Sequence, residues 1–298
     1  MELQRYRGRD DLDRLLAFCS AAAAAKLPSP PTWHPGDLVW QLRGRFDIAH
    51  ALYAAVEEGA VVGALWFQGE ELLIDALPGD ATRLSRLLGA AIEKARRAGS
   101  SRLRSGVRDE DDERQAALAT AGFSRTGPAN MRFERGLVLA PPTSPAAIPG
   151  LRLRDCVGID PEARAEVHRA AWSALDHMGI DATSEFSADE YLSLATGGVY
   201  DPHFDIVAET PDGRLVASAT AWADPASGTA VFEPVGADPE FRGAGLTAAV
   251  MAEAMVRLAA AGFRTARVGT AHFNASAIAA YAKAFDVAGR GSTWSLAL

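Results

Sequence analysis

The sequence predicts an α+β protein built from two similar halves. Its 298 residues are enough for two ordinary domains. A proline-rich stretch at residues 140–150 lies near the middle of the chain, and its prolines disfavour both helix and sheet. On either side of it, strand-like and helix-like segments recur in a similar order, which indicates an internal duplication. We therefore expect a first domain at residues 1–139, a linker at 140–150 and a second domain at 151–298.

The first half shows three strand-like segments and then alternating helix and strand patterns. Its strands are short apolar runs bounded by turn residues, whereas its helices have apolar residues at the helical period. Gly99 and Gly122 each follow a helical pattern, as glycine often does where a helix ends. The expected strands are residues 51–57, 61–67, 71–76 and 102–107, and the expected helices are residues 83–98 and 112–121.

The second half begins with helices and then repeats the order of strands and helices. The turn Pro211-Asp212-Gly213 separates its first two strands, because Pro and Gly favour tight-turn backbone angles. Gly262 again follows a helical pattern. The expected helices are residues 162–178, 188–195, 246–261 and 275–285, and the expected strands are residues 204–209, 214–223, 229–237, 264–270 and 292–296.

Composition excludes several classes of function. With 48% hydrophobic and 23% charged residues the chain is an ordinary globular protein. Its net charge of −8 argues against nucleic-acid binding, which relies on clustered Lys and Arg. Cys19 and Cys156 form no motif, so we expect neither a metal nor a disulfide framework. The N-terminus lacks an apolar signal core and residues 21–25 are too few to span a bilayer, so we expect a cytoplasmic protein without membrane contact and leave its oligomeric state open.

The most informative segment joins the expected strand 229–237 to the expected helix 246–261. Arg242 precedes Gly243-Ala244-Gly245, and glycine lets a backbone approach a ligand closely because it has no Cβ. The first N–H groups of a helix lack partners within the helix, and the helix dipole favours negative charge there. This turn therefore predicts a cradle for a pyrophosphate.

Two common phosphate-binding motifs fit this turn poorly. Gly243 to Ala248 formally matches the dinucleotide fingerprint, but spacer residues separate its glycines from the strand. The fingerprint also wants an acidic residue about 20 positions on, and residues 265–270 contain none. The Walker pattern fails because no Lys-Ser/Thr follows the glycines.

The segment instead resembles the acyl-CoA site of the GNAT superfamily of N-acetyltransferases. Its signature is Arg or Gln, two residues, Gly, one residue, then Gly or Ala. Arg242, Gly245 and Thr247 stand at these places, and Thr247 departs from the small residue. A second family motif is matched by Asn274, Ala277, Tyr281 and Phe285, although Asp286-Val287 replaces the usual Gly-Phe. The resemblance is close over residues 150–298 and implies two GNAT-like domains, each a mixed, mostly antiparallel sheet flanked by helices.

The resemblance implies that acetyl-CoA binds to the second half. In the family, two neighbouring parallel strands splay apart, and free backbone groups of one strand pair with the pantetheine arm. Here that edge would be Val235 to Ala237, with the pyrophosphate at the glycine turn. The expected cofactor-binding residues are Val235, Gly236, Ala237, Arg242, Gly243, Ala244, Gly245, Leu246, Thr247 and Asn274.

Glu233 and Tyr281 are the candidate catalytic residues. Glu233 shares a strand face with Val235, and related acetyltransferases carry a basic group there that takes the amine proton through a water. Its alternative role is an ion pair with an arginine of the first half. The family's tyrosine at the place of Tyr281 is a general acid for the thiolate; its alternative role is a core aromatic with its hydroxyl at the surface.

Three further residues are candidates for contact with the acceptor. His168, Trp172 and Asp176 are four residues apart in turn and so share one helix face, where Asp176 would attract a cationic amine. Their alternative role is a contact between domains. Because neither cysteine lies near the motifs, we expect direct attack on the thioester in a ternary complex.

The first half keeps the pattern of elements without the cofactor residues. Alignment of the two halves places Gly79, Thr82, Leu84, Glu110 and Ala117 opposite Arg242, Gly245, Thr247, Asn274 and Tyr281. We therefore expect one acetyl-CoA per chain and the function of an N-acetyltransferase acting on a small-molecule amine. The alternatives are a thiol-sugar acetyltransferase of the mycothiol-synthase type and a CoA-binding regulator without turnover.

Overall fold

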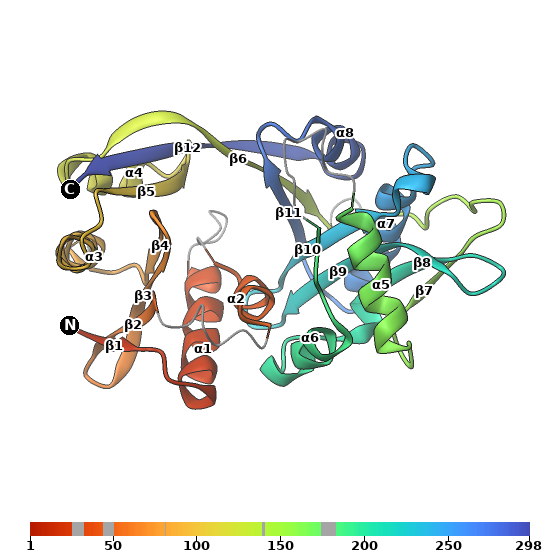
Figure 1. The fold of residues 1–298 in the computed structure, drawn as a ribbon, viewed down its shortest axis with the longest axis horizontal. Coiled ribbons are helices and arrows are strands. Elements are labelled where there is room, and N and C mark those ends of the chain that lie inside the picture. Colours follow the sequence, from red (N-terminus) through yellow and green to blue (C-terminus); the bar gives the residue numbers. More distant parts are fainter. Residues whose placement is uncertain (26–32, 44–50, 81, 139–140, 174–182) are drawn as a thin grey trace. The chain divides into compact units, whose positions relative to one another are not determined.

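The computed structural model describes residues 1–25, 33–43, 51–80, 82–138, 141–173 and 183–298 (Figure 1). The chain forms two compact units, and neither is one continuous stretch. Unit 1 contains Met1–Leu38, Arg45–Met131 and Gly289–Leu298. Unit 2 contains Val39–Gly44 and Arg132–Ala288. The last residues of the chain therefore belong to the unit that also contains its first residues.

Unit 1 contains a sheet, and its helices α1 to α4 lie between the strands in sequence. The strand order is β1-β2-β3-β4-β5-β12-β6; β4 and β5 run parallel, whereas β1 with β2, β2 with β3, β3 with β4 and β5 with β12 run antiparallel. Two long strands, β6 and β12, have residues in both units. The elements are β1 (Glu2–Arg5), α1 (Arg9–Ala25), α2 (Pro35–Leu42), β2 (Leu52–Glu57), β3 (Ala60–Gln68), β4 (Glu71–Ala76), α3 (Arg83–Arg97), β5 (Arg102–Arg108), α4 (Asp112–Thr120), β6 (Ser124–Gly136) and β12 (Val287–Ala297).

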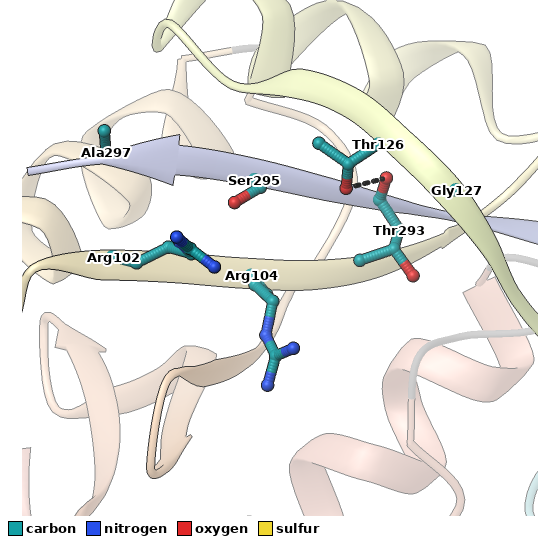
Figure 2. A pocket seen from close by; sticks show the side chains of 7 residues that line it. All are labelled: Arg102, Arg104, Thr126, Gly127, Thr293, Ser295 and Ala297. Atoms are coloured by element: carbon teal, nitrogen blue, oxygen red, sulfur yellow. Dashed lines mark hydrogen bonds between the residues drawn. The ribbon is translucent and has the colours of Figure 1, made fainter.

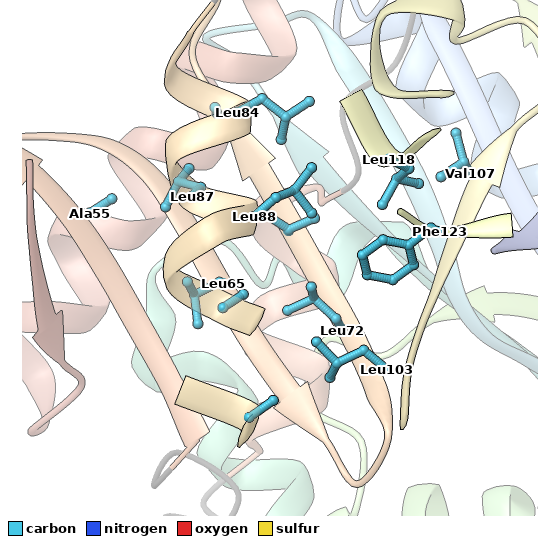
Figure 3. Packing of buried hydrophobic residues seen from close by; sticks show 14 residues of the cluster. Ala55, Leu65, Leu72, Leu84, Leu87, Leu88, Leu103, Val107, Leu118 and Phe123 are labelled. Atoms are coloured by element: carbon cyan, nitrogen blue, oxygen red, sulfur yellow. The ribbon is translucent and has the colours of Figure 1, made fainter. Parts of the chain in front are cut away.

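The core of unit 1 forms where α3 lies on the sheet (Figure 3). Leu84, Leu87, Leu88, Ala91 and Ala95 recur at helical spacing and form one buried face of α3. This face packs with apolar residues of β3, β4, β5 and α4, among them Leu65, Leu72, Leu103 and Leu118. The apolar periodicity that predicts the helix therefore also fixes the face that it buries.

Unit 2 contains strands in the order β6-β11-β10-β9-β8-β7. Here β10 and β11 are parallel. The pairs β7 with β8, β8 with β9, and β9 with β10 are antiparallel. Helices α5 and α7 both pack on β9, which is buried along most of its length. The elements are β7 (Arg152–Asp155), α5 (Pro161–Ala171), α6 (Ala188–Ser193), η3 (Leu194–Gly197), η4 (Pro202–Phe204), β8 (Asp205–Glu209), β9 (Leu215–Asp224), β10 (Thr229–Ala237), η5 (Pro239–Phe241), α7 (Leu246–Ala260), β11 (Thr265–Ala271) and α8 (Ala275–Ala284).

The α+β fold expected from the sequence is confirmed. Strands β4 and β10 have the predicted bounds, and the other predicted elements differ by a few residues at their ends. The expected helix 162–178 is observed as α5 up to Ala171, and its last residues lie outside the described ranges. The strand expected at 292–296 is longer, and its residues Gly291 to Ala297 pair with β5. The elements that the sequence patterns missed are β1, α1, α2, β6 and β7.

No helix in the described part of the chain is both long and apolar enough to cross a membrane.

Candidate active site

The central feature of unit 2 is an opening between β10 and β11. The parallel ladder joins Thr229–Phe232 to Thr265–Val268 and ends there. Beyond it, Val235, Gly236 and Ala237 stay paired with β9, after a register shift that follows Phe232. Within the described residues, the other edge of this segment has no strand partner. Buried backbone groups need hydrogen bonds, so this edge suits an extended ligand with amide groups.

Pro234 gives a local reason for the end of this ladder. Proline has no N–H to donate and is found in strands mainly at edges and bulges. Here it lies within the register shift between Phe232 and Val235. A proline in the middle of an otherwise regular strand is thus a sequence signal for the opening, one that the motif comparison overlooked.

The turn after β10 is braced by ion pairs and has two left-handed glycines. Arg214 contacts Asp238 and Glu240, with a distance of 2.9 Å to the Glu240 carboxylate. Gly243 has a φ of 84° and Gly245 a φ of 76°, which is why glycine is favoured at both places. A Cβ at either residue would meet nothing within 4 Å. The space beside this turn is therefore open.

Helix α7 begins without a side-chain cap. Gly245 is its N-cap residue and offers no side-chain acceptor. The N–H groups of the first turn are the usual unpaired donors of a helix N-terminus, and they lie next to the open turn. Leu246 is buried in the core, whereas Thr247 is half-buried. Because the Leu246 side chain is buried, this residue can contact a ligand only through its backbone.

Arg242 connects this turn to the end of α5. Its Nη2 lies 3.4 Å from the Ala171 carbonyl oxygen and 3.3 Å from that of Ser173. These carbonyls are at the negative end of α5, so the guanidinium is favoured there. The side chain is nevertheless exposed and can also act on an anion at the turn.

The charge of Glu233 on β10 acts on Tyr281 of α8. Tyr281 is 6% exposed and packs edge-on against Phe133 and Phe285, with ring centroids 5.8 and 6.4 Å away. Burial, and secondly the negative charge of Glu233, raise the pKa of Tyr281. The Tyr281 phenol is therefore kept protonated, and its ring belongs to the core.

Asn274 has a structural task at the start of α8. Its Oδ1 accepts hydrogen bonds from the Ala277 N–H at 3.2 Å and the Ser276 hydroxyl at 3.0 Å. It is therefore the N-cap of this helix, a position at which Asn is favoured. With Oδ1 engaged in the cap, the amide NH2 group is the part of the side chain suited to a ligand carbonyl.

His168 and Trp172 lie in an aromatic cluster. Their rings stack with centroids 4.3 Å apart, and Phe186 and Trp40 approach the His168 ring at 4.7 and 5.5 Å. Burial, followed by the charges of Arg164, Arg43 and Arg169, lowers the pKa of His168 to about 3. The imidazole is therefore neutral and acts as a packing group at ordinary pH.

Trp172 is the member of this cluster that reaches the opened strand. A Cβ built on Gly236 would lie 2.7 Å from the Trp172 ring, so glycine is required where this ring crosses β10. The structure thus places one predicted acceptor residue against one predicted cofactor residue. Asp176, the third predicted acceptor residue, lies outside the described residues.

A buried polar network behind this cluster was not predicted from the sequence. Arg164 on α5 makes two hydrogen bonds of 3.0 Å to Asp205, and Arg164 and Asp205 are 1% and 0% exposed. Tyr200 donates to Asp205 at 2.9 Å and contacts the Trp222 ring, and the Trp222 indole N–H donates to the Glu233 carbonyl. The network therefore fixes α5 on the sheet and supports Glu233. An Arg and an Asp distant in sequence give no local signal of such a pairing.

Cys156 lies beside this network. Burial and the negative charge of Asp205 raise the pKa of the Cys156 thiol well above its ordinary value. Cys19, in unit 1, is also buried. A nucleophilic cysteine needs exposure and a lowered pKa, and Cys156 has neither.

The matching place in unit 1 is filled by the chain itself. Among the residues that the structure describes, the parallel ladder of β4 and β5 consists of the pair Glu71 with Arg104, so these strands also separate. Between them, Ser105 donates to the Leu72 carbonyl, and Arg114 binds the Ile74 carbonyl and the Asp75 carboxylate. Arg114 is 5% exposed, so this arrangement is internal.

The start of α3 is likewise engaged. Asp80 accepts hydrogen bonds from the Thr82 N–H and hydroxyl at 2.8 and 2.7 Å, and it pairs with Arg86. This carboxylate would repel a phosphate at the start of α3. Leu84 is buried in the core. Glu110, opposite Asn274 in the alignment, is exposed and pairs with Arg108.

Among the residues that the structure describes, no group of His, Cys, Asp and Glu side chains is arranged to hold a metal ion.

Comparison with known proteins assigns the class of this site. Residues 171–286 match the model of the Acetyltransferase (GNAT) family. This segment runs from the end of α5 through β10, the glycine turn and α7 to α8. No curated protein sequence gives a match.

Solved structures resemble the chain over nearly its full length. A tandem GNAT protein from the clavulanic acid biosynthesis pathway, without AcCoA, has a TM-score of 0.65 and 21% identity, over 99% of this chain and 98% of that one. A GNAT-family acetyltransferase from Colwellia psychrerythraea has a TM-score of 0.60 and 15% identity, over 100% of both chains. A GCN5-related N-acetyltransferase from Sphaerobacter thermophilus has a TM-score of 0.59 and 16% identity, over 99% and 95%. At these identities the likeness establishes the fold.

The chain therefore has the fold of these acetyltransferases, with a parallel strand pair that separates at β10 and β11. The family match covers residues 171–286, the segment that carries both motifs, so this part of the chain matches the GNAT family as the motifs predicted. Its fold is that of two GNAT-like domains, which agrees with the full-length likeness to a tandem protein.

Proposed function

We propose that the protein is an N-acetyltransferase that moves an acetyl group from acetyl-CoA to a small-molecule amine. The observation that carries this proposal is the edge of β10 at Val235–Ala237, which leaves the ladder with β11 beside the uncapped start of α7. Unpaired backbone groups and a helix N-terminus are the features that a pantetheine arm and a pyrophosphate require.

The residues present fit acetyl-CoA at this place. Val235 to Ala237 would pair with the amide groups of the pantetheine arm. The backbone of Gly243, Ala244, Gly245, Leu246 and Thr247, with the Arg242 guanidinium, would hold the pyrophosphate. The Asn274 amide NH2 would donate to a carbonyl of the arm. When bound, acetyl-CoA supplies an acetyl group activated as a thioester.

Glu233 and Tyr281 are the residues to which we assign proton transfer. The Glu233 carboxylate accepts a proton from the amine, because only a neutral amine is nucleophilic. The Tyr281 hydroxyl holds a proton for the leaving sulfur, and its raised pKa keeps that proton in place at neutral pH. The electrostatic coupling of Glu233 to Tyr281 supports both assignments.

The cysteines support transfer without an acyl-enzyme. Cys156 is buried, its thiol has a raised pKa, and it lies in the Arg164–Asp205 network rather than at the opening. Cys19 belongs to unit 1 and is 1% exposed. We therefore assign direct attack of the amine on the thioester, in a ternary complex.

The acceptor is assigned to the α5 side of β10. Trp172 supplies a flat apolar wall against Gly236, and the His168 ring stacks on the Trp172 ring. Asp176 stays in the proposal as the group that attracts a cationic amine. We also keep the proposal that the first half, up to the linker at 140–150, binds no acetyl-CoA, because Arg114 lies between β4 and β5 and the Asp80 carboxylate lies before the start of α3.

Calorimetric titration with acetyl-CoA tests the cofactor site. Arg242→Ala should weaken binding about tenfold or more, which is the usual loss for one charge-assisted contact. Gly245→Glu should weaken it further, because it adds a negative charge at the helix N-terminus. Gly245→Ala is the matched control, since it introduces the same left-handed strain without the charge. Equal affinities of the Ala and Glu variants would contradict the site.

Release of CoA with a panel of amines tests the reaction. Turnover with one class of amine and none without an acceptor is the expected result. Turnover with thiol-sugar acceptors alone would favour the mycothiol-synthase-like alternative. Tight acetyl-CoA binding with no turnover for any amine or thiol would favour a regulator.

A further inference from the structure

Unit 1 has a pocket that the proposed acetyl transfer does not use. Its volume is about 560 Å³, within the range of small-molecule sites. Figure 2 shows Arg102 and Arg104 on β5 beside β12, with Ser295 and Thr293 on β12 and Thr126 on β6; the Arg104 side chain extends away from β12. The lining residues are Arg102, Arg104, Thr126, Gly127, Thr293, Ser295 and Ala297.

Strand alternation places both arginines on this face of the sheet. Leu103, Ser105 and Val107 point toward the core and are 0%, 2% and 3% exposed. Arg102 and Arg104 therefore point to the opposite side. Across the antiparallel ladder, Arg104 pairs with Ser295 and Arg102 with Ala297, so β12 contributes small and hydroxyl side chains next to the two arginine positions.

The pocket is cationic in a protein of net charge −8. No carboxylate lines it. In the described chain, Arg102 has no ion-pair partner, and Arg104 has Glu71 at 3.0 Å and Glu70 at 3.7 Å. The Arg104 pairs are solvent-exposed, and such pairs are weak enough for a ligand to compete with them.

The remaining donors suit an oxyanion. Thr126 donates to the Thr293 carbonyl and Thr293 donates to the Pro128 carbonyl, so these hydroxyls are engaged within the protein. The donors left to a ligand are the two guanidinium groups and the Ser295 hydroxyl. A guanidinium binds carboxylates and phosphates through two parallel N–H groups. A Cβ at Gly127 would meet nothing within 4 Å, so the space beside this residue is open.

We propose that this pocket of unit 1 binds a small organic anion through a phosphate or carboxylate group held by Arg102, Arg104 and Ser295. The volume exceeds what a single inorganic ion needs, so the ligand is a molecule of sugar or small metabolite size. The site is independent of acetyl-CoA, because none of its residues belongs to the opening between β10 and β11.

Calorimetry on the full chain tests this proposal with three matched probes: glucose 6-phosphate, gluconate and glucose. We expect glucose 6-phosphate or gluconate to bind and glucose not to bind. Binding of only one anion identifies phosphate or carboxylate as the preferred group. Absence of binding by both anions at millimolar concentration, or equal binding of glucose, would overturn the proposal.

Substitution of single arginines tests whether the anion binds at this pocket. Arg102→Gln should lower the affinity for the anion about tenfold or more, because it removes one charge-assisted contact made by an exposed side chain. Arg97→Gln, an exposed arginine of α3 that does not line the pocket, is the control and should leave binding unchanged. Arg102→Gln should also leave acetyl-CoA affinity unchanged. Equal weakening by both substitutions would show a non-specific charge effect and refute the assignment.

Discussion

The buried imidazole of His168 should make the protein lose stability as the pH falls below neutrality. Burial and three arginines lower the pKa of His168 to about 3 from an ordinary value of 6.5. In the unfolded chain the imidazole takes up a proton below pH 6.5, whereas in the folded chain it does not do so until about pH 3. The folded state therefore has its full stability above pH 6.5 and loses it between pH 6.5 and pH 3.

The loss has a definite slope. One proton bound only by the unfolded state costs about 1.4 kcal/mol per pH unit, so this residue alone should cost about 2 kcal/mol at pH 5. His168→Phe keeps an aromatic ring in the cluster with Trp172 and Phe186 and removes the titration. Its Nδ1 has no hydrogen-bond partner among the described residues, so little is lost at neutral pH.

Urea unfolding followed by tryptophan fluorescence measures the effect. Wild type and His168→Phe should have similar free energies of unfolding at pH 7, and the variant should be more stable by about 2 kcal/mol at pH 5. His272→Phe, which replaces an exposed imidazole, should follow the wild-type pH dependence. Parallel curves for wild type and His168→Phe would refute the argument and would place His168 in contact with solvent.

The catalytic pair and the cofactor stoichiometry give further predictions. Tyr281→Phe should lower kcat about a hundredfold or more with little change in acetyl-CoA affinity, because the proton is needed only when the sulfur leaves; an unchanged kcat would return Tyr281 to a packing role. Glu233→Gln should remove the acidic limb of the rate–pH profile, and a profile like wild type would make Glu233 structural. Titration of the intact chain should give one acetyl-CoA per chain, since Arg114 binds between β4 and β5 and the Asp80 carboxylate would repel a phosphate before α3. Two sites would refute that reasoning.

Features with a local cause were predicted from the sequence. The strand at 229–237, the glycine turn and the helix that starts at Leu246 are all observed. Each depends on neighbouring residues: alternating apolar side chains, glycines that accept a positive φ, and apolar residues at helical spacing. The family motifs lie within these elements, so the superfamily was recognisable before any pairing of strands was known.

Several missed elements have weak local patterns. Strands β1 and β7 have four residues each, too few for a periodic signal. Helix α1 ends in an alanine run that favours a helix but says little about which face is buried. Strand β6 contains Gly127 and Pro128, which argue locally against a strand. Tertiary contacts overrode these local preferences.

The sequence by itself determined that the chain has two GNAT-like halves and that the second half carries the turn and the tyrosine of the family. Only the tertiary structure decided that Gly291 to Ala297 pair with β5, that the charge of Glu233 acts on Tyr281, and that Arg114 fills the opening of unit 1. The physical reason is the separation along the chain of the residues that interact. Turn and helix formation depend on residues a few positions apart, whereas strand pairing and the burial of a charge depend on partners brought together from distant parts of the chain.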